Sequence, residues 1–154
     1  AAVSYGLYVH LVGLGLRSGV LQGFIDEYEQ SLGPNDWPNY VLGNHDRHRL
    51  VSRLRAGRAR LLGMLQLTLR GLPVVYYGEE LGLPDTPVAI AELRDPWERR
   101  VPGFGLGRDP ARTPMPWNGE NGGGFTTGTP WLPLGPAAAE HNVDAESRDS
   151  ESSV

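Results

Sequence analysis

Blocks of apolar residues follow two different spacings along the chain, and these predict a helix followed by a strand. From residue 20 onward, apolar side chains recur three and four positions apart, which is the spacing of one face of a helix. This set comprises Leu21, Phe24, Ile25 and Tyr28. A short apolar run over residues 37–42 then ends at Gly43 and predicts a strand.

A second helix and a second strand follow in the same order. The stretch that begins near residue 51 or 59 and ends at Leu69 is leucine-rich on most sides, which predicts a buried helix. Residues 72–77 form another apolar run, closed by Gly78, and predict a buried strand. Strands joined through a helix pair in parallel, so their carboxyl ends meet on one rim. The pattern is therefore typical of an α/β protein with a parallel sheet or a (β/α)8 barrel.

The pattern is weaker outside this centre. A strand and a turn are expected within residues 3–16, although glycines weaken any element there. Prolines interrupt residues 82–136 repeatedly, so we predict a long loop, and loops of this length are usually functional. The chain end, residues 141–154, is rich in Ser, Asp and Glu and is predicted to be a frayed or truncated tail.

Composition excludes several classes of protein. The chain has 154 residues, which suits one domain but is only about 60% of a typical (β/α)8 barrel. Without Cys there is no disulfide or thiolate nucleophile, and without Lys there is no Schiff base. A net charge of -4 argues against a nucleic-acid partner. The first residues are a poor signal peptide and too interrupted to span a membrane, so we expect a cytoplasmic protein with no membrane partner.

A cluster of polar residues directly follows the first predicted strand, and three interpretations compete. His45, Asp46 and His48 are proper metal ligands, although adjacent strand residues point to opposite faces. Alternatively, His45 and Asp46 cap the next helix. In the third interpretation, Asp46 and His45 bind a polyhydroxylated substrate. No G-x-S-x-G motif or phosphate-binding loop occurs, which disfavours serine hydrolases and nucleotide-binding folds.

Three motifs, found in the right order, resemble glycoside hydrolase family 13, the α-amylase superfamily. Residues 40–46, which read YVLGNHD, look like the family's motif near strand 7. Residues 71–82, GLPVVYYGEELG, resemble its strand 8. Residues 107–117, GRDPARTPMPW, resemble a loop of the α-glucosidase, oligo-1,6-glucosidase and trehalose-synthase branch. The similarity covers roughly residues 24–149.

The resemblance implies the fold and the reaction. It implies a partial (β/α)8 TIM barrel that contains strands 7 and 8, their helix and the long loop after strand 8. We divide the chain into a poorly matched segment 1–23, a barrel portion 24–140 and the tail 141–154. The implied reaction is retaining hydrolysis of α-glucosidic bonds in an α-glucoside or a malto- or isomalto-oligosaccharide. No cofactor is indicated. The alternatives are a trehalose-synthase or sucrose-acting relative and a non-catalytic carbohydrate-binding fragment.

The same resemblance assigns roles to five residues. Asp46 is implied to be the carboxylate that stabilises the transition state, and His45 to donate a hydrogen bond to the same sugar. Arg112 is implied to reach the non-reducing end of the glucose, unless it only orders the loop by pairing with a neighbour such as Asp109. At the rim, Arg47 and His48 are candidates for contact with the next sugar.

Two residues that the family mechanism needs do not occur in this sequence. A retaining glycosidase uses a nucleophile and a general acid/base on either side of the bond. By resemblance the nucleophile lies in a Gly-x-Arg-x-Asp stretch and the acid is a Glu at the end of the next strand, and neither is found. Glu79 and Glu80 are expected to be structural. We therefore expect this chain to be inactive on its own.

Overall fold

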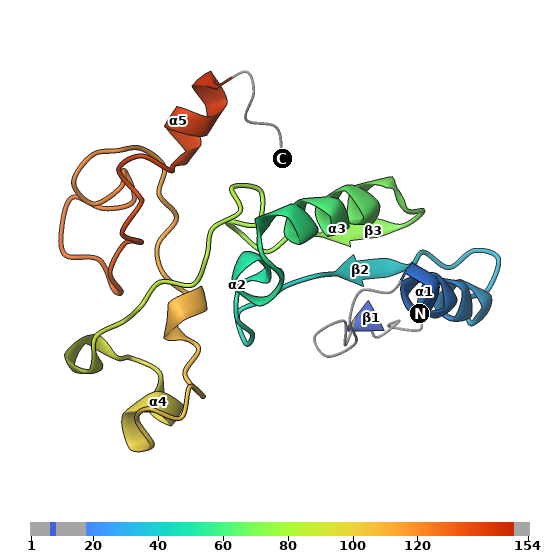
Figure 1. Cartoon of the computed structure of the whole chain (residues 1–154), viewed down its shortest axis with the longest axis horizontal. Coiled ribbons are helices and arrows are strands. Elements are labelled where there is room, and N and C mark those ends of the chain that lie inside the picture. Colours follow the sequence, from blue (N-terminus) through green and yellow to red (C-terminus); the bar gives the residue numbers. More distant parts are fainter. Residues whose placement is uncertain (1–6, 9–17, 150–154) are drawn as a thin grey trace.

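Three short parallel strands form the centre of the protein (Figure 1). The structure, a computed structural model, describes residues 7–8 and 18–149. The strands lie in the order β1 (Leu7–Tyr8), β2 (Asn39–Val41) and β3 (Leu72–Val74). This confirms the parallel strands that the sequence predicts, although β2 and β3 are shorter than expected. The prediction that the second strand is buried was wrong, because Leu72 and Val74 are exposed. Of the strand and turn expected within residues 3–16, only β1 lies inside the described residues.

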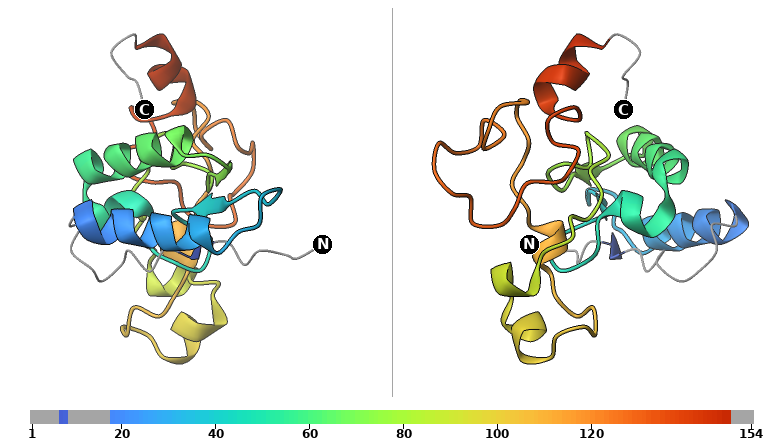
Figure 2. Two further views of the ribbon diagram at one scale, coloured as in Figure 1. Left: turned by 90° about the vertical axis from the view of Figure 1, so that its right-hand side faces the viewer. Right: turned by 60° about the vertical axis from the view of Figure 1, so that its left-hand side comes forward.

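Helices connect the strands and lie together on one side of the molecule (Figure 2). The first connection contains α1 (Ser18–Gln30), and the second contains α2 (Leu50–Leu54) and α3 (Ala56–Thr68). Much of the segment after β3 lies on the other side of the molecule. This is the βαβ arrangement in which parallel strands present their carboxyl ends along one rim.

A glycine permits the close pairing of β2 with β3. Gly71 has a φ of +131°, and a Cβ at this position would lie 2.5 Å from the Pro38 carbonyl oxygen. The same carbonyl accepts a hydrogen bond of 2.8 Å from Leu72 N. Because only glycine adopts this backbone conformation without strain, Gly71 lets the chain enter β3 directly against β2.

The core lies between α2, α3 and the sheet. Leu50, Ala59 and Leu62 are buried there, and five partly buried residues pack against them: Leu21, Leu42, Val51, Leu54 and Leu65. The buried side chain of Gln66 lies at the edge of this core. Its Nε2 donates to Tyr40 O at 2.7 Å and to Val74 O at 3.0 Å. One α3 side chain therefore links the backbones of β2 and β3.

The predicted helix that ends at Leu69 corresponds to α3, but its earlier predicted start, near residue 51, and its predicted burial were wrong. The helix is broken at Arg55, which has a φ of 67° and separates α2 from α3. Its outer face is also exposed, with Leu61, Met64 and Leu67 58%, 60% and 61% accessible to solvent. A helix that is apolar all round is buried only where something covers both faces, and among the described residues the outer face of α3 is open.

The long segment after β3 contains three short helices among its described residues before residue 112. It contains η1 (Ile90–Glu92), α4 (Pro96–Arg100) and η2 (Asp109–Ala111). Within the predicted tail, α5 (Val143–Arg148) is a helix capped by Asn142, and residues 150–154 lie outside the described residues. Among the helices that the structure describes, none has the length and hydropathy needed to cross a membrane.

The role of Gln66 can be measured by its removal. We expect Gln66→Leu to lower the free energy of unfolding by about 1–3 kcal/mol, because two strand carbonyls lose a buried donor. Urea unfolding followed by circular dichroism measures the change. Gln22→Leu, on the exposed face of α1, is the control and should change stability little. Equal losses in the two variants would contradict the role assigned to Gln66.

Candidate functional site

The candidate site begins where β2 ends. Beyond Val41 the chain turns sharply, and Asn44 Oδ1 accepts a 2.9 Å hydrogen bond from the backbone N–H of Asp46. Arg53, on α2, fixes both sides of this turn through hydrogen bonds to Leu42 O and His48 O. Burial lowers the pKa of Arg53, which still carries its charge at neutral pH. The turn thus presents Asp46 at the carboxyl edge of the sheet.

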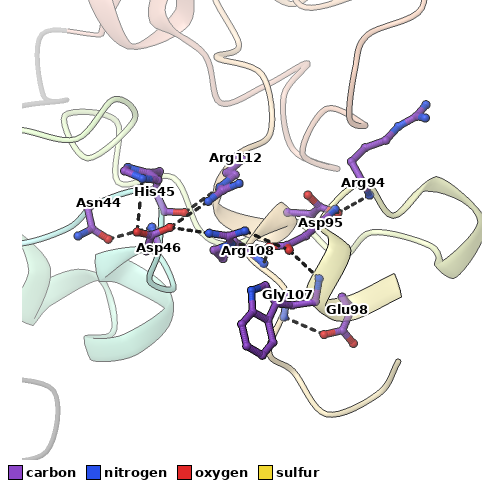
Figure 3. A network of polar contacts seen from close by, with 11 residues as sticks. Asn44, His45, Asp46, Arg94, Asp95, Glu98, Gly107, Arg108 and Arg112 are labelled. Carbon is purple, nitrogen blue, oxygen red and sulfur yellow. Dashed lines mark hydrogen bonds and ion pairs between the residues drawn. The ribbon is translucent and has the colours of Figure 1, made fainter. Parts of the chain in front are cut away.

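Two arginines from the long segment converge on the carboxylate of Asp46 (Figure 3). Its Oδ1 accepts from Arg108 Nη1 at 3.1 Å and from Arg112 Nη2 at 3.0 Å. Its Oδ2 lies 3.4 Å from His45 Nε2. Burial tends to raise the pKa of Asp46, but the Arg108 hydrogen bond and the charges of His45, Arg108 and Arg112 outweigh it and lower that pKa. The carboxylate is therefore ionised at neutral pH.

These contacts decide two of the alternatives left open by the sequence. The interpretation of His45 and Asp46 as helix caps was wrong, because α2 is preceded by Arg49 and has no side-chain cap. The pairing of Arg112 with Asp109 was also wrong. Arg112 donates to Asp46 and to His45 O, whereas Asp109 accepts from backbone N–H groups. Both carboxylates satisfy groups that lie far from them in sequence.

The backbone on both sides of Arg112 is held by two tyrosines that follow β3. Tyr76 donates its hydroxyl to Ala111 O at 3.1 Å, and Tyr77 donates to Thr113 O at 2.8 Å. The guanidinium of Arg49 lies 5.5 Å and 4.8 Å from the centres of these two rings. It is buried and donates to Tyr77 O at 2.7 Å. The buried cation of Arg49 therefore packs against the two tyrosines that hold the backbone on either side of Arg112.

Sequence reasoning missed the second arginine and its partner. Arg108 is not among the five residues to which the resemblance assigns a role, yet it bridges Asp46 and the buried Asp95. The Arg108 hydrogen bond holds the pKa of Asp95 well below its usual range. Asp95 also accepts from Trp97 N and caps α4. The Asp-Pro pair at residues 95–96 is a helix-start signal that could have located α4 in the sequence.

The two remaining candidates lie apart from this network. His48 Nδ1 lies 2.6 Å from Asp85 Oδ2, and the other carboxylate oxygen of Asp85 accepts from Arg49 N. Arg47 is exposed, and among the described contacts none joins its side chain to Asp46. The structure thus brings Asp46, His45 and Arg112 together and leaves Arg47 and His48 at the edge. Within the part of the chain that the structure describes, no group of three or more acidic or His side chains is placed to hold a metal ion.

Glu79 is linked to the candidate site through the backbone of Tyr76. Its Oε2 accepts from Tyr76 N at 2.9 Å, while Oε1 is buried with no hydrogen-bond partner among the described residues. A Cβ at Gly43 would collide with this carboxylate, so the glycine that ends the first apolar run makes room for it. Burial raises the pKa of Glu79 despite the hydrogen bond from Tyr76 and the charge of Arg53.

A cavity of about 430 Å³ lies between α2, α3 and α5. Its walls are mainly apolar and include Leu42, Val51 and Leu67 together with Glu79 and His141. These walls do not include His45, Arg108 or Arg112, the three residues that contact the Asp46 carboxylate. The cavity is therefore separate from the candidate site.

Comparison with known proteins identifies the family. A family model described as the catalytic domain of α-amylase matches residues 17–154. The chain belongs to the α-amylase family. The catalytic domain of this family is a (β/α)8 barrel, and the parallel sheet with its helices is a part of one.

Curated relatives of the chain include an α-glucosidase and an oligo-1,6-glucosidase. The chain is 33% identical over 154 residues to an α-glucosidase of Apis mellifera, which covers 94% of this chain and 26% of the relative. It is also 33% identical over 156 residues to an oligo-1,6-glucosidase of Parageobacillus thermoglucosidasius, covering 86% of this chain and 28% of that enzyme. The chain therefore spans about a quarter of the length of these curated relatives.

A solved structure has a similar fold over this region. The α-glucosyl transfer enzyme XgtA superposes with a TM-score of 0.78 at 33% identity, covering 88% of this chain and 26% of that one. The similarity in sequence and in fold confirms the resemblance to the α-glucosidase branch that the three motifs suggested.

The raised pKa of Glu79 predicts how its replacement changes stability with pH. A carboxyl whose pKa is higher in the folded state stabilises the fold below its unfolded pKa, and this contribution is lost as the pH rises through the folded pKa. We therefore expect Glu79→Gln to gain stability relative to the wild type as the pH rises from about 4 to about 7. Urea unfolding at several pH values measures the difference. Glu27→Gln, an exposed position on α1, should show no such trend, and identical trends would refute the prediction.

Proposed function

We propose that the chain forms one wall of the sugar-binding site of an α-glucosidase-type glycoside hydrolase. The enzyme would act on α-glucosidic bonds of short oligosaccharides with retention of configuration. In this proposal β2 and β3 are strands 7 and 8 of the barrel. The observation that carries it is the ionised Asp46 carboxylate at the end of β2, with His45 and two arginines around it.

Asp46 would stabilise the transition state. Glycoside hydrolysis passes through a state with positive charge on the sugar ring, and a fixed carboxylate stabilises that charge. Both arginines contact Oδ1, so Oδ2, which among the described contacts has only His45 Nε2 nearby at 3.4 Å, is the oxygen that we assign to the sugar hydroxyls. A carboxylate held before the sugar binds needs little reorganisation during the reaction, which favours the transition state over the ground state.

His45 and Arg112 would bind the same glucose. Arg112 Nε donates to His45 O, and the two tyrosines hold the backbone of the residues on either side of Arg112. Its guanidinium offers a rigid fork of donors to the hydroxyls at the non-reducing end. Such a contact closes the pocket behind one sugar and favours exo-cleavage. We propose that Arg47 and His48, which are exposed at the edge of the site, contact the next sugar.

The role of Asp46 is tested in the product of the complete open reading frame that contains these residues, with p-nitrophenyl α-glucoside and maltose as substrates. We expect Asp46→Asn to lower kcat by at least about 100-fold, because the developing charge loses its stabilising carboxylate. Asp26→Asn, the same change on the exposed face of α1, is the control and should leave kcat unchanged. Unaltered turnover in Asp46→Asn would refute the assignment of Asp46.

The 154 residues alone should not turn over substrate. A retaining glycosidase needs two carboxyl groups about 5 Å apart across the bond, and this sequence lacks the Gly-x-Arg-x-Asp stretch that carries one of them in the family. Release of nitrophenol from p-nitrophenyl α-glucoside, compared with a heat-inactivated sample, measures the activity. Turnover above that background would mean that a second carboxylate of this chain serves as nucleophile.

Transfer of the glucosyl unit is the second candidate function. The superposition on an α-glucosyl transfer enzyme favours it, since hydrolysis and transfer differ only in the acceptor that takes the sugar. Analysis of the products formed from maltose separates the two reactions. Free glucose alone indicates hydrolysis, and longer or rearranged oligosaccharides indicate transfer. Binding without turnover by the complete product would instead favour a carbohydrate-binding role.

A further inference from the structure

The guanidinium of Arg108 is shared between two carboxylates of very different burial. Its Nε donates to Asp95 Oδ2 at 2.6 Å and its Nη2 to Asp95 Oδ1 at 3.2 Å, which leaves Nη1 for Asp46 at 3.1 Å. The side chain of Asp95 is fully buried, whereas that of Asp46 is 46% exposed. Arg108 is therefore anchored at its buried end and presents one donor to the site.

The position of Asp95 is fixed by hydrogen bonds within the long segment after β3. Asp95 accepts from Trp97 N at 3.0 Å and from Arg108 N at 2.9 Å. The backbone N–H groups of Arg94 and Asp95 donate to Asp109 Oδ2 at 2.6 Å and 2.8 Å. None of these contacts needs a sugar, so the donor of Arg108 is in place before one binds.

Arg112 lacks such an anchor at its guanidinium. Its Nε donates to His45 O and its Nη2 to Asp46, and the described hydrogen bonds of the side chain include no second carboxylate. A sugar hydroxyl that accepts from Arg112 Nη2 would compete with Asp46 Oδ1 for that donor. Arg108 is less free to turn toward a sugar, because its two hydrogen bonds to Asp95 fix the plane of its guanidinium. The two arginines that share Oδ1 thus differ in what they can do once the site is occupied.

We infer that Arg108 is the positioning residue for Asp46, and that through its fork with the buried Asp95 it holds the carboxylate in place while Arg112 engages the sugar. This inference rests on the proposed function for its catalytic consequence. The geometric part, that Arg108 holds Asp46, stands on the contacts of this chain alone. Arg108 itself touches no reacting atom.

The first experiment needs no activity. The pKa of Asp46 is measured by carboxyl ¹³C NMR titration of the 154-residue protein. We expect Arg108→Gln to raise this pKa toward the ordinary Asp value, because the carboxylate loses a charged donor. Arg94→Gln is the matched control, since Arg94 points away from Asp46 and lies over Trp131, and it should leave the pKa unchanged (Figure 3). An unchanged pKa in Arg108→Gln would overturn the inference.

A second variant separates position from charge. Arg108→Lys keeps one positive charge beside Asp95 but cannot form a fork and reach Asp46 at the same time. We expect a pKa of Asp46 between those of the wild type and Arg108→Gln. This variant also decides the question if Arg108→Gln does not fold, as judged by circular dichroism. A pKa equal to that of the wild type would show that charge alone suffices and would refute positioning by the fork.

The catalytic consequence is measured in the product of the complete open reading frame. We expect Arg108→Gln and Arg108→Lys to lower kcat by about tenfold or more with little change in KM, and to move the acidic limb of kcat/KM to higher pH. Arg112→Gln should mainly raise KM. Equal effects of the Arg108 and Arg112 variants on KM would contradict the division of roles. If that product is inactive, the proposed function fails, while the NMR titration still decides whether Arg108 holds Asp46.

Discussion

The arrangement of the candidate site depends on the pairing of one carboxylate with two arginines. Arg108 and Arg112 lie 62 and 66 residues beyond Asp46, so their contacts bring the long segment after β3 back over the end of β2. The carboxylate is half exposed, and ion pairs of that kind contribute little to stability. Their effect is on geometry and ionisation: the site holds a charged oxygen at a fixed place without having to create it when a sugar arrives.

The two neighbouring strands β2 and β3 each position a different part of the candidate site. β2 ends in the turn that presents Asp46, and β3 is followed by Tyr76 and Tyr77, whose hydroxyls hold the backbone around Arg112. Parallel pairing puts both strand ends on one rim, so two local features of the sequence become one three-dimensional arrangement. The buried cation of Arg49 beneath the two rings belongs to neither strand and ties the tyrosines to the start of α2.

The sequence predicted what depends on local spacing and on motifs. The order of helices and strands, their parallel pairing and the family all follow from short patterns that need no knowledge of distant contacts. The role of Arg108 could not be predicted in this way, because the proline-rich segment has no periodicity that indicates which part of it contacts the end of β2. The break at Arg55 was equally invisible, since a positive φ at a non-glycine residue has no signature in composition. The open outer face of α3 depends on what surrounds the helix, which hydrophobic periodicity does not report.

The close approach of Gly43 to Glu79 constrains how this site can be altered. Any side chain at residue 43 would meet the Glu79 carboxylate, and Glu79 in turn holds the backbone at Tyr76. The effects of substitutions at residues in direct contact are not additive, so the two positions form one unit of variation. A library that diversifies residue 43 while keeping Glu79 fixed would place every new side chain against that carboxylate. One that pairs larger residues at position 43 with shorter ones at position 79 would sample productive combinations.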